Sequence, residues 1–75
     1  MGKLPRISGK EMVRFLEQLG YSVIRTRSSH HFIAGKGKQT SVPVHGNRSL
    51  KIGTLRGILR DIGMSPEEFE QLRNA

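Results

Sequence analysis

The residues best suited to chemistry in this chain are two adjacent histidines, His30 and His31, within residues 27–32. An imidazole has an ordinary pKa of about 6.5, so it accepts or donates a proton near neutral pH. RNA cleavage without a metal needs one group to take the proton of the 2′-hydroxyl and another to protonate the leaving 5′-oxygen. A well-placed histidine in this stretch therefore suits either role in acid–base cleavage of RNA. The simpler alternative is that these histidines pack or hydrogen-bond within a sheet.

A metal site is not expected. Successive residues of a strand point to opposite faces, so His30 and His31 do not readily share one metal ion, and no nearby carboxylate completes a ligand set. The third histidine, His45, precedes the turn pair Gly46-Asn47. A histidine in that position more often bonds loop backbone.

The charge is strongly positive and unevenly distributed. Thirteen Lys and Arg against six Asp and Glu give a net charge of +7. Residues 1–60 hold twelve basic and two acidic side chains, a net +10, whereas residues 61–75 hold one basic and four acidic, a net −3. A small domain this basic favours a polyanion such as nucleic acid over a merely solvated charged surface.

Several basic side chains are candidates for phosphate contact near the predicted sheet. Cations beside a scissile phosphate stabilise the charge that grows on it during cleavage. Arg25, Arg27 and Lys51 are expected near the histidines, and Lys36 and Lys38 lie at a predicted hairpin tip. The predicted RNA-binding residues are thus Arg25, Arg27, Lys36, Lys38 and Lys51.

The length and composition limit the class of protein. Seventy-five residues predict one domain, residues 1–75, of marginal stability. The absence of cysteine excludes a disulfide framework and a cysteine-based zinc site. No apolar run approaches the ~18 residues of a membrane span, and the N-terminus lacks the apolar segment of a signal peptide. These features predict a cytoplasmic protein.

Helix and strand signals alternate clearly along the chain. Ser8 and Glu11 form a capping box before an apolar stripe that runs to Leu19, and Gly20 is the expected end of that helix. β-branched and aromatic residues then predict strands at residues 21–27, 30–34 and 39–44. Turns are expected at residues 28–29 and 35–38.

Two further helices complete the pattern. The first is expected at residues 51–62, with a buried stripe made of Ile52, Leu55, Ile58, Leu59 and Ile62. A second capping box at residues 65–68 starts a short helix that runs to about Arg73. The order α-β-β-β-α-α predicts an α+β two-layer sandwich, in which helices cover one face of a three-stranded antiparallel sheet. That layout is close to the double-stranded-RNA-binding-domain fold.

Strand periodicity raises a question about His30. It places His30 on the same face as Phe32, and a phenylalanine at that position is normally in the core. We therefore expect His30 to lie before the regular part of its strand.

Four groups of residues resemble the HicA (YcfA-like) toxin family of HicA–HicB toxin–antitoxin pairs. The resemblance covers nearly the whole chain. It is carried by residues 9–21, by residues 29–32, by residues 42–47, and by residues 53–60 with Gly63 and Phe69. The last two groups are specific in their order and spacing.

The resemblance implies a fold, an activity and a site. It implies a fold like that of double-stranded-RNA-binding domains, and translation-independent cleavage of mRNA with neither a cofactor nor a metal. The family's catalytic histidine follows Gly-Ser at the start of the second strand, which corresponds to His30. Ser28 departs from this motif because it stands where the family usually has glycine, and a positive φ there would disfavour serine. The implied partner is a HicB-like antitoxin that covers the active face.

Two other functions are compatible with the sequence. A non-catalytic double-stranded-RNA-binding module would bind a duplex through its shape and phosphates, with salt-sensitive affinity and no strand scission. A DNA-binding partner protein is disfavoured because no helix-turn-helix pattern is evident.

Overall fold

A computed structural model describes residues 4–74 of the chain. Its elements follow the order α-β-β-β-α-α, which confirms the predicted α+β class. They are α1 (Gly9–Gln18), β1 (Ser22–Arg27), β2 (His30–Gly35), β3 (Lys38–Pro43), α2 (Ile52–Ile62) and α3 (Pro66–Arg73). None of the described helices is long and apolar enough to cross a membrane.

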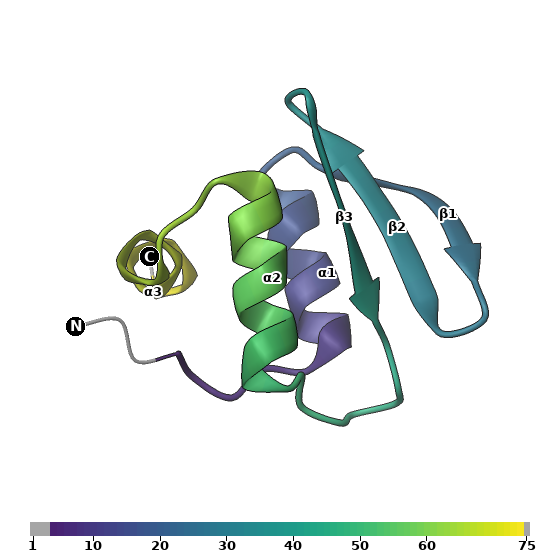
Figure 1. Ribbon diagram of the computed structural model, residues 1–75, viewed down its shortest axis with the longest axis horizontal. Coiled ribbons are helices and arrows are strands. Elements are labelled where there is room, and N and C mark those ends of the chain that lie inside the picture. Colours follow the sequence, from purple (N-terminus) through teal and green to yellow (C-terminus); the bar gives the residue numbers. More distant parts are fainter. Residues whose placement is uncertain (1–3, 75) are drawn as a thin grey trace.

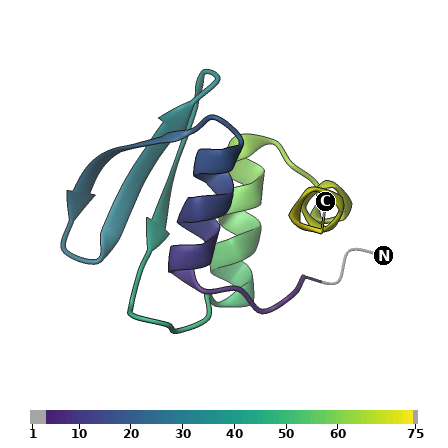
Figure 2. The same ribbon diagram turned by 180° about the vertical axis from the view of Figure 1, so that it is seen from behind.

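The strands form one antiparallel sheet in the order β1-β2-β3, and α1 and α2 cover one of its faces (Figure 1). The predicted placement of helices on a single face is therefore confirmed. Seen from behind, α3 lies on the far side of α1 and α2 from the sheet (Figure 2). The other face of the sheet carries no helix among the described residues.

The predicted capping box begins α1. The Ser8 backbone N–H donates to Glu11 Oε1 at 2.9 Å, and the Glu11 backbone N–H donates to Ser8 Oγ at 3.1 Å. The hydrogen bonds from Ser8, first from its backbone and then from its side chain, lower the pKa of the Glu11 carboxyl. The helix ends before Gly20, whose φ of 101° reverses the chain into β1.

α2 ends as predicted, but its first residue differs from the prediction. Gly63 has a left-handed conformation with φ 71° and terminates the helix. Ile52 was expected in the buried stripe, yet its side chain is 48% exposed. Ile52 is the first helical residue, a turn before buried Leu55, and Leu50 packs against the core at this end instead.

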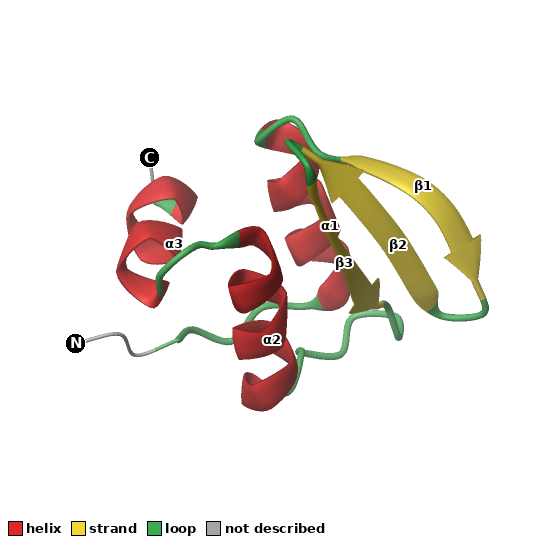
Figure 3. Ribbon diagram, turned by 45° about the horizontal axis from the view of Figure 1, so that its top comes forward, coloured by secondary structure: helices red, strands yellow, loops and turns green. Residues whose placement is uncertain are grey.

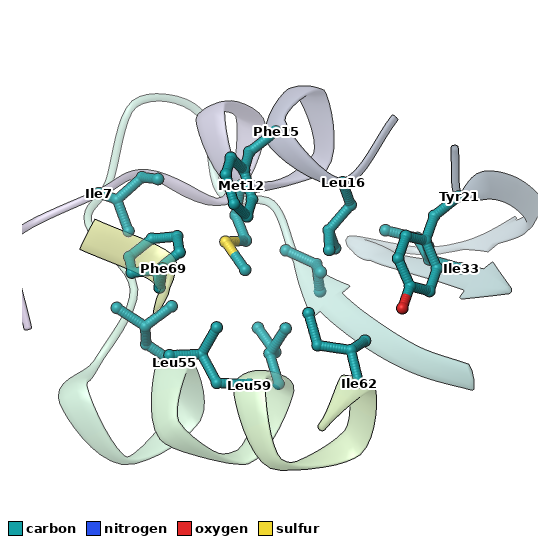
Figure 4. Close-up of a cluster of buried hydrophobic side chains, with 12 residues drawn as sticks. Ile7, Met12, Phe15, Leu16, Tyr21, Ile33, Leu55, Leu59, Ile62 and Phe69 are labelled. Carbon is teal, nitrogen blue, oxygen red and sulfur yellow. The ribbon is translucent and has the colours of Figure 1, made fainter. Parts of the chain in front are cut away.

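The core lies between the sheet and the helices and extends to α3 (Figure 4). Phe69 of α3 is fully buried, and its ring meets that of Phe15 edge-on at 5.0 Å between centroids. The buried hydrophobic residues are Ile7, Met12, Phe15, Leu16, Tyr21, Ile33, Val42, Leu55, Ile58, Leu59, Ile62 and Phe69.

Both hairpin turns have two residues. The loop expected at residues 35–38 is shorter than predicted, because Gly35 pairs with Lys38 and only Lys36 and Gly37 remain unpaired. Both have positive φ, 53° and 75°, as a type I′ turn requires. The first turn occupies residues 28–29 as predicted, and Ser28 has φ 56°.

Candidate active site

His30 is the first residue of β2 and points away from the helices. It pairs with Arg27 of β1 and with Pro43 of β3, and its side chain is exposed. The expectation that Phe32 is a core residue and that His30 precedes the regular strand was wrong. The buried face of β2 is carried by Ile33, which is 1% exposed, so His30 and Phe32 share the open face.

A bulge in β1 brings arginines to the same face. The β1–β2 pairing shifts between Val23 and Arg25, so that Val23 opposes core-facing Ile33 whereas Arg25 opposes Phe32. The Arg25 guanidinium carbon lies 5.0 Å from the centre of the Phe32 ring, within cation–π range. We call Arg25, Arg27, His30 and Phe32 the open-face cluster.

Backbone contacts from three segments fix the turn that precedes His30. The Val44 N–H donates to the Ser29 carbonyl at 2.7 Å, which ties the β1–β2 turn to the chain leaving β3. The first residue of α1, Gly9, lies so close to Pro43 that a Cβ there would collide with the Pro43 carbonyl. Figure 3 shows the β1–β2 turn and the end of β3 at the same end of the sheet. The histidine is therefore positioned by backbone contacts.

A small cavity opens at this end of the sheet, between the end of β3 and the start of α2. Its volume is about 280 Å³, and Pro43 contributes to its wall. The His45 carbonyl accepts a hydrogen bond from the Arg48 N–H at 3.0 Å. This bond closes a turn in the segment that lines the cavity. Its lining includes His45, Arg48, Ser49, Lys51 and Thr54. We call it the loop pocket.

His31 lies on the opposite face from His30, as predicted. It opposes fully buried Val42, is half-buried, and contributes to a cavity of about 200 Å³ beside α1. Its Nδ1 atom is buried without a hydrogen-bond partner. The two imidazoles therefore do not converge, and residues 4–74 hold no group of three or more His, Cys, Asp or Glu that could bind a metal.

Comparison with protein families assigns the chain. A model of the HicA toxin of bacterial toxin–antitoxin systems matches residues 9–64, well over half of the sequence. The chain belongs to the HicA toxin family. No curated protein and no solved structure matches it. The HicA match runs from the first residue of α1 to just past α2, so α3 lies outside it.

The basic residues proposed to bind RNA fall into separate regions of this HicA-family fold. Arg25 and Arg27 lie with His30, and Lys51 precedes α2 beside the loop pocket. Lys36 and Lys38 follow the opposite end of β2, five residues or about 17 Å from His30.

Both distant lysines have structural contacts. The Lys36 ammonium lies 5.5 Å from the centre of the Tyr21 ring. The Lys38 ammonium lies beside Gly63, where a positive charge favours the C-terminus of α2. Each of these two lysines therefore has a contact within the protein.

Sequence reasoning missed the loop pocket of this HicA-family chain. Arg48 was not singled out, and His45 was assigned only to loop structure. The available signal was the three-residue spacing of His45, Arg48 and Lys51 between a strand and a helix. Because that segment has no regular structure, the spacing alone does not indicate where the side chains meet.

Proposed function

We propose that this HicA-family toxin is an mRNA interferase, an endoribonuclease in which His30 is a general acid or base. The observation that carries the proposal is an exposed histidine at a fixed turn, opposite Arg27 on a sheet face that no described helix covers. In the reaction, the RNA 2′-oxygen bonds to phosphorus as the bond to the 5′-oxygen breaks. The 2′-hydroxyl loses its proton and the 5′-oxygen gains one.

The arrangement of the open-face cluster supports proton transfer by His30 and stabilisation of the phosphate charge by the arginines. His30 is accessible to a substrate and exchanges a proton with either oxygen. Arg27 is its cross-strand neighbour, so its guanidinium reaches a phosphate held at His30 and stabilises the growing negative charge. Arg25 is held over Phe32 and adds a second positive charge to the path of the RNA.

The same face suits the antitoxin partner that the toxin–antitoxin family implies. We propose that a HicB-like antitoxin covers His30 in the cytoplasm, with residues 1–75 acting as one toxin domain. The net charge of +10 over residues 1–60 favours an acidic partner surface, because complementary charge speeds and orients association.

The first test compares wild-type protein with His30→Ala on single-stranded RNA in the presence of EDTA. Loss of a well-placed general acid or base is expected to slow cleavage by about 10²–10⁴-fold. His31→Gln is the matched control, because it changes the adjacent histidine on the other face and should retain most of the activity. Undiminished cleavage by folded His30→Ala protein would refute the role, and loss of wild-type cleavage in EDTA would refute metal independence.

A non-catalytic RNA-binding module remains the second candidate, because the α-β-β-β-α order also occurs in double-stranded-RNA-binding domains. It predicts salt-sensitive binding to duplex RNA and no strand scission by the wild type. The cleavage assay distinguishes the two functions, with a duplex of the same sequence as the second substrate.

A further inference from the structure

The loop pocket has a composition that suits one chemical group. The polar residues that line it are Arg48, Lys51 and His45, together with Ser49 and Thr54. All of these side chains can donate hydrogen bonds, and no carboxylate lines the pocket. By contrast, the two cavities beside α1 contain Glu11 and Glu17. The pocket is therefore suited to an anion.

The size and position of the pocket narrow the choice of anion. Its volume of about 280 Å³ lies at or below the lower end of small-molecule sites, ~300 Å³, so it fits a compact group better than a whole nucleotide. Pro43 contributes to its wall and is also the cross-strand partner of His30. Only one strand spacing, about 5 Å, separates the backbones of these two residues.

We propose that the loop pocket is a phosphate subsite for the RNA backbone, bound by Arg48 and Lys51. It holds a phosphate next to the scissile one, so the RNA strand runs from His30 across Pro43 into the pocket. This inference rests on the proposed ribonuclease function, which it deepens by naming the residues that position the substrate. Arg48 supplies a planar pair of donors and Lys51 a compact charge, which together complement phosphate oxygens.

The test measures RNA binding separately from cleavage. A fluorescently labelled single-stranded RNA is titrated with His30→Ala protein, which leaves the RNA intact, at several salt concentrations. Adding Lys51→Ala or Arg48→Ala should weaken binding about tenfold each, the effect of losing a charged hydrogen bond. Each should also flatten the salt dependence by about 0.7 in log Kd per log salt, as expected for one lost phosphate contact on a single strand.

Arg60→Ala is the matched control for charge. It removes one positive charge from the same helix, about 13 Å along the axis from Lys51. It should change the affinity less than twofold and leave the salt dependence unchanged. If Lys51→Ala, Arg48→Ala and Arg60→Ala have equal effects, only net charge matters and the pocket is not a subsite.

Thr54→Glu separates loss of binding from loss of folding. The substitution brings a carboxylate to the pocket, so RNA affinity should fall more than tenfold. Because an acidic residue in the first turn of a helix is favourable, the melting temperature should stay the same or rise. Unchanged RNA affinity in this variant overturns the proposal.

Two further outcomes separate this proposal from its alternatives. If Lys51→Ala weakens binding of an acidic antitoxin but not of RNA, the pocket serves a protein partner and the phosphate subsite is overturned. Failure of the wild type to cleave RNA refutes the proposed catalysis, but the binding series still decides whether the pocket holds a phosphate.

Discussion

At the scale of single residues, the turn before His30 is the most informative feature. Ser28 has φ 56°, a left-handed conformation that costs a non-glycine residue about 1–2 kcal/mol. Glycine, which has no Cβ, adopts a positive φ without this steric cost. The turn forms here with serine, and the Val44 N–H donates a hydrogen bond to the carbonyl of the following residue, Ser29.

Replacement of Ser28 with glycine should therefore stabilise the protein. Relief of the left-handed strain exceeds the extra chain entropy that glycine adds to the unfolded state, so we expect a net gain of about 0.5–1 kcal/mol. For a domain of this size that corresponds to a melting temperature higher by ~2–8 °C in a calorimetric scan. Ser29→Gly is the matched control and should lower the melting temperature, since φ at Ser29 is not positive. A Ser28→Gly variant no more stable than the wild type would contradict the strain argument.

The faces of the two histidines were only partly predictable. Strand periodicity correctly placed His30 and His31 on opposite sides. It did not indicate which side is covered, because both His31-Ile33 and His30-Phe32 are plausible core pairs by composition. The helices decide this by packing on Ile33, and the bulge in β1 moves Arg25 to the open face. Both are tertiary effects without a local signal.

At the scale of elements, local chemistry predicted the helix ends well. Both capping boxes, at Ser8 and Ser65, and the glycine end of α2 are present. These features depend on contacts between residues no more than four positions apart, so all the interacting groups can be identified from a short stretch of sequence. The strand limits and the exposure of Ile52 were less accurate, because they depend on pairing partners and on Leu50 filling the core.

The capping box of α1 should make stability depend on pH. The pKa of Glu11 is lowered from its usual 4.5, so the folded state favours the carboxylate. Its contribution is fully present above that value and is lost as the pH falls through the lowered pKa. We expect Glu11→Gln to destabilise the protein at pH 7, with the difference shrinking below pH about 4, as measured by urea denaturation at each pH.

Ser8→Ala tests the other half of the same capping box. Loss of the cap should cost about 1 kcal/mol at neutral pH. In that background, Glu11→Gln should have a smaller effect than in the wild type, because the hydrogen bonds that favour the carboxylate are weakened. Equal effects of Glu11→Gln in both backgrounds would show that the two side chains act independently.

At the scale of the whole molecule, three of the six acidic residues are concentrated on one helix. The acidic residues Glu67, Glu68 and Glu70 belong to α3, which lies beyond α1 and α2 from the sheet (Figures 1 and 2). The arginines of the open-face cluster are on the other side. This concentration of acidic residues disfavours approach of a polyanion to α3, so in the proposed reaction it favours approach of RNA from the sheet side, where His30 lies.

α3 should also determine whether the domain folds, although it lies outside the family match. Phe69 is fully buried against Phe15, and truncating such a ring costs about 3–5 kcal/mol. A chain of this length has only ~4–11 kcal/mol of total stability. Phe69→Ala should therefore unfold a substantial part of the population near 37 °C, visible as a large fall in the urea midpoint.

Leu72→Ala is the matched control on the same helix, because Leu72 is 46% exposed and its substitution should change stability by less than about 0.5 kcal/mol. If Phe69→Ala is as stable as Leu72→Ala, residues 9–64 fold without the support of α3.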